Sequence, residues 1–146
     1  MEPRVNVITL GVSDLERARR FYQDALGFPM STAGNEHIAF FRLGPIVLAL
    51  FGRDALADDA GLAKTPPPAP GAFPGFTLAH NVRERDDVDR VLATVERAGA
   101  AILVAAHDAF WGGRSGYFAD PDGNAWEVAW NPHFPLDAAG QVALTS

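Results

Sequence analysis

Hydrophobic and polar positions follow the same succession of patterns twice along the chain. Residues 5–12 alternate as in a strand, and 13–27 then carry apolar side chains at helical spacing. The succession recurs with a strand over 75–82 and a helix over 83–99. Each helix ends in a glycine, and Ser13 is expected to cap the first one, because Glu16 follows it at the spacing of a capping box. The chain is therefore built from two similar halves.

Short strands are predicted after each helix. In the first half they cover 36–43 and 45–51, with a weaker strand near 28–33. In the second half they cover 101–105, 115–119 and 124–130, and Asp120-Pro121-Asp122-Gly123 has the composition of a type I turn before the last of them. Together these elements predict an α+β fold of two βαβββ modules.

The module boundaries follow from the same pattern. The first module is assigned to 1–51 and the second to 75–134, with a C-terminal tail over 135–146. The segment 52–74 is rich in Pro, which cannot donate to a β-ladder, so it is expected to be an extended linker, either a partial lid or a plain connection. Each half alone would leave a sheet face unburied, so the halves must pair within one chain or between two, and we expect a homodimer.

Charge and composition narrow the function. The net charge of −6 and the scattered basic residues argue against binding to nucleic acid. No apolar run is long enough to span a membrane. The absence of Cys excludes a disulfide framework, a thiolate nucleophile and a Cys-based zinc site, and a cytoplasmic protein is expected. An acidic chain of this kind is suited to small cationic molecules.

Two segments resemble the vicinal-oxygen-chelate superfamily, namely "GVSDLERARRFYQDALGF" and "GYFADPDGNAWEVAW". This superfamily includes glyoxalase I, extradiol dioxygenases, fosfomycin-resistance enzymes and bleomycin-resistance proteins. The resemblance extends from about residue 4 to residue 131. It implies that the two modules form a cup-shaped mixed sheet with the helices on its outer face. In the metal-dependent members, the cup holds one divalent ion.

The resemblance also implies where the metal ligands would fall. The four positions are occupied by Val7, Ala49, Thr77 and Glu127, and only Glu127 is a strong donor. A catalytic divalent cation usually has at least three protein ligands, so we expect no metal cofactor. None of the four histidines is expected to compensate, and His80 is interpreted as a core residue under a helix.

Without metal ligands, the cup becomes a cavity of small side chains with a few polar groups, which is typical of a site for a small organic molecule. Trp111, in a glycine-rich loop, and Tyr117 are interpreted as an aromatic wall, although a plug or a dimer contact would also explain them. Trp126 and Trp130 are interpreted as structural. The predicted ligand-binding residues are Val7, Ala49, Thr77, Trp111, Arg114, Tyr117, Glu127 and Asn131.

Glu127 is the candidate catalytic residue, and three roles remain open for it. A buried carboxylate without a metal has a raised pKa and can act as a general acid or base. The same carboxylate can hold a cationic ligand. It can also be structural, satisfied by Arg114 or by backbone amides.

The favoured function is a metal-independent small-molecule-binding protein of the glyoxalase and bleomycin-resistance type. One alternative is a glyoxalase-like or dioxygenase-like enzyme, a lyase, isomerase or dioxygenase, that uses Glu127 with a divalent metal. The other is an interaction module whose cup is filled by side chains. Whether the chain is an enzyme is left open.

Overall fold

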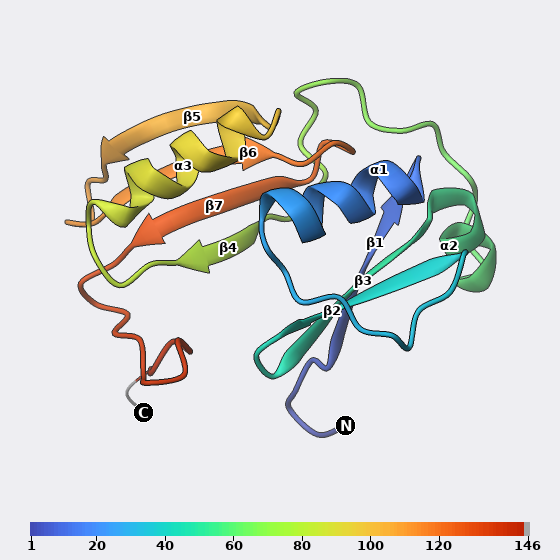
Figure 1. Cartoon of the computed structure of the whole chain (residues 1–146), viewed down its shortest axis with the longest axis horizontal. Helices are drawn as coiled ribbons and strands as arrows, with labels where there is room; N and C mark the ends of the chain where they lie inside the picture. Colours follow the sequence, from blue (N-terminus) through green and yellow to red (C-terminus); the bar gives the residue numbers. More distant parts are fainter. Residues whose placement is uncertain (145–146) are drawn as a thin grey trace. The chain divides into compact units, whose positions relative to one another are not determined.

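The computed structural model describes residues 1–144 and divides into two compact units, 1–67 and Pro68 onward (Figure 1). The first unit contains a three-stranded sheet and the second a four-stranded sheet. The predicted α+β class is therefore confirmed. The boundary between the units lies inside the Pro-rich segment. Among the described residues, no helix has the length and apolar character needed to cross a membrane.

The sheet of the first unit has the strand order β1-β3-β2. Its strands are β1 (Val7–Val12), β2 (Ile38–Leu43) and β3 (Ile46–Gly52). β1 runs parallel to β3, whereas β2 is antiparallel to it. The turn between β2 and β3 contains Gly44 with φ of 60°, a conformation that costs glycine little. These strands match the predicted ones to within a few residues.

The first helix is α1 (Leu15–Arg20), which continues as the π-helical segment η1 (Phe21–Ala25). Its N-cap is Asp14 and not Ser13, because the Asp14 carboxylate accepts a hydrogen bond of 2.9 Å from the Arg17 amide. Tyr22 is fully buried, and its ring centre lies 6.0 Å from that of Phe41 on β2. The helix therefore covers the face of the sheet that carries Phe41.

The weak strand expected near 28–33 is reduced to one antiparallel bridge between Met30 and Phe41. Pro29 has no N–H to donate, although its carbonyl accepts a hydrogen bond of 3.1 Å from the Arg42 amide. The chain then turns away, with the Asn35 amide bonded to the Ile38 carbonyl at 2.9 Å. The first unit is thus βαββ and departs from the predicted βαβββ order by this strand.

A helix, α2 (Arg53–Asp59), occupies the start of the segment that was expected to be an extended linker. The expectation was wrong for these residues because the prolines are concentrated beyond Thr65. α2 also has a surface to pack on: a Cβ at Gly11 of β1 would lie 3.2 Å from the Arg53 Cα and 3.4 Å from Leu56. Residues 60–77 carry neither helix nor strand.

The second unit has the predicted βαβββ order. Its elements are β4 (Leu78–Asn81), α3 (Asp87–Arg97), β5 (Ala101–Asp108), β6 (Arg114–Ala119) and β7 (Ala125–Trp130). The strand order is β4-β7-β6-β5, with β4 parallel to β7 and the other pairs antiparallel. The turn before β7 is tight because the buried Asp120 carboxylate accepts from the amides of Asp122 (2.9 Å) and Asn124 (2.8 Å).

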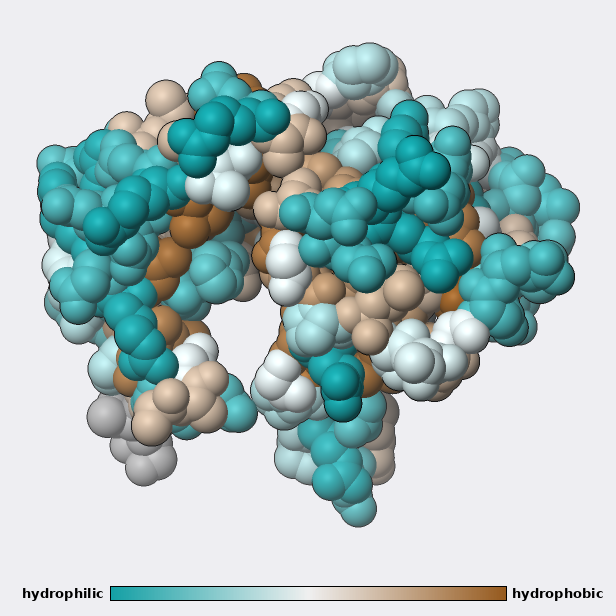
Figure 2. All heavy atoms as spheres, viewed as in Figure 1, coloured by the Kyte–Doolittle hydropathy of each residue, from teal (hydrophilic) through white to brown (hydrophobic). Residues whose placement is uncertain are grey.

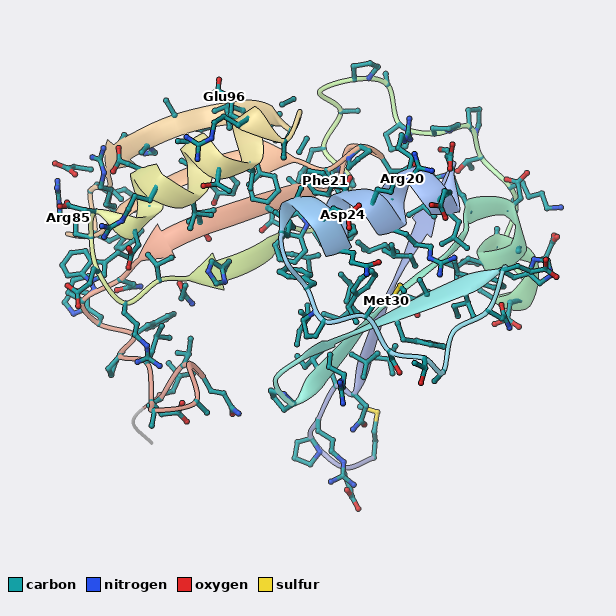
Figure 3. All side chains as sticks on the ribbon, viewed as in Figure 1. Arg20, Phe21, Asp24, Met30, Arg85 and Glu96 are labelled. Carbon is teal, nitrogen blue, oxygen red and sulfur yellow. The ribbon has the colours of Figure 1, made fainter. Side chains whose placement is uncertain are left out.

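α3 packs against β5, β6 and β7 through Val88, Leu92 and Val95, all of which are buried. Its outer side is hydrophilic, and Glu96 lies on that side near the helix end (Figures 2 and 3). The buried ring of Trp126 stacks on Phe118 with ring centres 6.1 Å apart. Trp126 is structural, as predicted.

The described part of the C-terminal tail is folded. Leu136 and Val142 form an antiparallel bridge, so the tail doubles back as a short hairpin. Arg83, between β4 and α3, donates hydrogen bonds to the carbonyls of Asp137 (2.7 Å) and Ala138 (3.2 Å). Arg83 therefore joins the tail to the connection between β4 and α3.

Candidate functional site

Glu127 lies on the face of the four-stranded sheet opposite to α3. A Cβ at Gly116 of β6 would meet the Leu92 side chain at 2.5 Å, so the Gly116 side of the sheet is the helix side. Glu127 pairs in register with Tyr117 on β6 and with Ala79 on β4, and alternation directs all three to the other side. We call this side the Glu127 face; its members are Ala79, Ser115, Tyr117, Glu127 and Ala129.

Tyr117 and Glu127 form the polar centre of the Glu127 face. Both side chains are half-buried, and the Tyr117 hydroxyl donates a hydrogen bond to the Glu127 carboxylate. The pKa of Tyr117 is raised, first because burial disfavours the phenolate, and then because of the negative charge of Glu127 and the hydrogen bond to it. The raised pKa keeps the Tyr117 phenol protonated at neutral pH.

Arg114 does not join the Tyr117–Glu127 pair. It faces the helix side, where its Nε and Nη2 donate to the two oxygens of Asp89 on α3 at 2.7 and 2.8 Å. Its Nη1 donates to Asp108 Oδ1 at the end of β5 at 3.0 Å, and Arg85, beside the start of α3 in Figure 3, pairs with the same oxygen. The structural role in which Arg114 satisfies Glu127 is therefore wrong.

The electrostatics of this cluster follow from the guanidinium groups. Hydrogen bonds from Arg114 lower the pKa of Asp89 and of Asp108, and the nearby charge of Arg85 adds to the effect. The two carboxylates in turn raise the pKa of Arg114 further above its usual value. The cluster thus stays fully ionised across the neutral range.

Trp111 lies in the connection between β5 and β6. A Cβ at Gly113 would lie 1.7 Å from Cζ3 of the Trp111 ring, so the ring occupies the space that a side chain at position 113 would need. The same Cβ would lie 2.4 Å from the carbonyl oxygen of Trp130, so the ring stands at the start of β6 beside the end of β7.

The remaining predicted residues are dispersed. Thr77 is exposed just before β4, and Asn131 is half-buried just after β7, where its Oδ1 accepts from the His133 amide at 2.9 Å. Asn131 also lines a groove of about 460 Å³ with Arg83, Trp130 and Phe134. Trp130 is half-buried there, so it is less enclosed than its structural interpretation implies.

Val7 and Ala49 belong to the first unit. Ala49 is buried and pairs in register with Thr9, whereas Val7 pairs with Val47 and is 48% exposed. Val7 lies two residues before Thr9, the register neighbour of Ala49. In the same way, Thr77 lies two residues before Ala79, the register neighbour of Glu127. The corresponding positions therefore have the same register in the two halves of the repeat.

The donor set does not fit a divalent metal within either unit. The register neighbours of Glu127 offer one phenol and one methyl group, and the positions that the resemblance assigns to ligands carry Val7, Ala49 and Thr77. Over residues 1–144, no group of three or more His, Asp, Glu or Cys side chains is placed to hold an ion. His80, expected in the core, lies on the edge strand β4 with part of its side chain exposed, although burial of the rest still lowers the pKa of its imidazole.

Two features of the site escaped the sequence analysis. The Asp89–Arg114–Asp108 cluster joins residues from three elements, and nothing local connects them. The face on which Arg114 lies could, however, have been predicted from the sequence. Arg114 and Tyr117 are three residues apart on one strand, so their side chains point to opposite faces of the sheet.

Comparison with known proteins identifies the family. Residues 4–128 match the model of the glyoxalase/bleomycin resistance protein/dioxygenase superfamily. The chain belongs to this superfamily, and the resemblance found in the sequence is confirmed.

Several individual relatives are similar to the chain. It is 32% identical over 123 residues to the uncharacterized protein YraH of Bacillus subtilis (strain 168), covering 83% of the chain and 93% of the relative. A crystal structure of a glyoxalase-related enzyme from Fulvimarina pelagi is 38% identical, covers 99% of both chains and gives a TM-score of 0.86. Lactoylglutathione lyase from Agrobacterium tumefaciens is 25% identical over 88% of this chain and 93% of its own, with a TM-score of 0.65.

Proposed function

We propose that this protein binds a small organic molecule carrying a cationic or other N–H donor group, and that Glu127 recognises that group without a metal. The observation that carries the proposal is the state of the Glu127 carboxylate. Among the described residues its hydrogen-bond partner is a neutral phenol, and no Arg, Lys or His forms an ion pair with it. A half-buried carboxylate with spare acceptor capacity is suited to a donor supplied by a ligand.

The surroundings of the carboxylate support this reading. The neighbours along and across the strands, Ala79, Ser115 and Ala129, carry small side chains without a charge, so they do not compete for the carboxylate. Trp111, next to Gly113 at the start of β6, offers an aromatic surface against which an apolar part of a ligand can pack. The hydrogen bond from the Tyr117 hydroxyl uses one acceptor position of Glu127 and leaves its other positions for a ligand.

The proposal is tested with matched ligands and matched variants. Isothermal titration calorimetry at pH 7 compares 2-phenylethylamine, which is cationic, with its neutral isostere 2-phenylethanol. We expect the amine to bind more tightly, and Glu127→Gln to weaken amine binding roughly tenfold, since a charge-assisted contact at a half-exposed site contributes about 1.4 kcal/mol. The control is Glu96→Gln, which removes the same charge from the outer side of α3 (Figure 3). Equal binding of amine and alcohol, or equal effects of the two variants, would refute the proposal.

A metal-dependent lyase, isomerase or dioxygenase remains the second candidate. It is favoured by the 38% identity to a protein described as a glyoxalase-related enzyme. The experiment is incubation with Ni, Zn, Mn and Fe(II), followed by measurement of metal per chain. One ion per chain that is lost in Glu127→Gln would overturn metal-independent binding and establish this candidate.

The third candidate is an interaction module whose Glu127 face is filled. An unchanged Trp fluorescence across a panel of aromatic amines would support it, because a ligand near Trp111 should change the emission.

We further propose that the protein is a cytoplasmic homodimer. Light scattering coupled to size-exclusion chromatography tests the oligomeric state.

A further inference from the structure

The connection between β5 and β6, residues 109–113, carries two aromatic side chains that differ in their exposure to solvent. Phe110 is fully exposed, whereas Trp111 is half-buried and lies over Gly113. The connection is a closed loop: the Ala109 amide donates to the Gly113 carbonyl at 2.9 Å, and the Gly112 amide donates to the Ala109 carbonyl at 3.0 Å. The position of the loop on the sheet therefore decides the position of Trp111.

The base of this loop is held on the helix side of the sheet. Asp108 ends β5, Arg114 begins β6, and the two pair in register and through a hydrogen bond of 3.0 Å. Arg114 then reaches α3 through two parallel bonds to Asp89, a geometry that fixes direction as well as distance. The Arg114 side chain is only 18% exposed, whereas its partner Asp89 is 51% exposed, so the fork lies at the edge of the packed surface between α3 and β6.

The consequence concerns Trp111, because Gly113, against which its ring lies, is bonded directly to Arg114. A shift at the start of β6 therefore moves Gly113 and the backbone under the ring together. Arg114 thus affects Trp111 through the backbone, with no contact between the two side chains required.

We propose that Arg114 is a positioning residue, which fixes Trp111 against Gly113 by joining the base of the 109–113 loop to α3. The inference rests on the proposed function only in assigning the Trp111 ring to ligand contact; the positioning itself belongs to the ligand-free protein. Loss of the guanidinium would also remove the hydrogen bonds that join Asp89 of α3 to Asp108 of β5, which leaves Arg85 as the nearby cation for both carboxylates.

The test uses the full-length protein labelled with 5-fluorotryptophan, because the chain contains only three Trp and each gives its own fluorine signal. Trp111→Phe assigns the loop signal. In Arg114→Ala, at a temperature well below its unfolding midpoint, we expect the Trp111 signal to move toward its position in the urea-unfolded protein. The signal of Trp126, which stacks on Phe118 inside the unit, should not move.

Arg90→Ala is the matched control, because it removes the same charge and the same side chain from α3 at a 67% exposed position paired with Asp87. It should leave all three signals in place. Asp89→Asn is a second variant with a smaller perturbation that keeps the shape of the acceptor, and a shift of the Trp111 signal in the same direction is expected. An unchanged Trp111 signal in folded Arg114→Ala or Asp89→Asn, or equal shifts of all three signals, overturns the inference.

Titration with 2-phenylethylamine separates the inference from the proposed function. If the amine binds the wild-type protein, Arg114→Ala should weaken its binding several-fold without abolishing the preference over 2-phenylethanol, since Glu127 is intact. If the amine does not bind, the proposed function fails, while the ligand-free fluorine spectra still decide the role of Arg114.

Discussion

The packing of α3 on the sheet that carries the Glu127 face allows a quantitative test. Leu92 is 5% exposed, and its Cδ1 lies only 2.5 Å from the point where a Cβ would stand at Gly116. Leu92→Ala removes a buried side chain and opens a cavity, which typically costs about 2–5 kcal/mol, and we expect roughly 3 kcal/mol because the site is nearly closed. Gly116→Ala overpacks the same place, at a cost of about 1–3 kcal/mol.

The double variant makes this prediction specific. In a Leu92→Ala background the new methyl group no longer meets Leu92, although the Val104 carbonyl still lies 2.8 Å from its position. The combined loss of unfolding free energy should therefore fall at least about 1 kcal/mol short of the sum of the single losses.

Urea unfolding followed by Trp fluorescence measures these free energies. All three Trp, at 111, 126 and 130, lie in the second unit, so the signal reports that unit. Losses that add to within about 0.5 kcal/mol would refute the direct contact between Leu92 and position 116.

Two further predictions concern pH. Glu127→Gln should lower the pKa of Tyr117, because the negative charge of Glu127 is lost, yet leave it above the ordinary 10.0 because burial is the largest cause of the shift. Absorbance at 295 nm measures this pKa, Tyr117→Phe separates it from that of Tyr22, and an unchanged titration contradicts the pairing. The lowered pKa values of Asp89 and Asp108 stabilise the folded state above their ordinary value of 3.8, and this stabilisation is lost as the pH falls through the lower folded values. Arg114→Ala should therefore flatten the decrease in stability between about pH 5 and pH 2 relative to Arg90→Ala, and equal slopes would show that Arg114 does not hold these carboxylates.

Most of the elements were predictable because their signals are local. The helix α3, which ends two residues before Gly99, and the strands β6 and β7 follow from side-chain period and from turn residues such as Asp120 and Gly123. The errors also have local causes. Pro29 reduced a short strand to a bridge, and the Pro-rich composition of 52–74 concealed the helix that begins at Arg53.

The candidate site was predictable in part. Glu127 stood out as a single carboxylate in an apolar strand, and alternation gave the side on which it lies. Its partner did not follow from the sequence, because the hydrogen bond from Tyr117 depends on the register between β6 and β7. Arg114 was misplaced for a related reason: its partner Asp89 lies 25 residues away on another element.

The amino-acid sequence alone established the repeat, the α+β class, the superfamily and the isolation of Glu127 among weak donors, since these depend on residue identity and short-range period. Only the tertiary structure determined three features: the pairing of Tyr117 with Glu127, the partners of Arg114, and the position of the Trp111 ring against Gly113. Each depends on the register between strands or on the packing of α3 on the sheet. The contacts that stabilise them join residues that are distant in the sequence or belong to different elements.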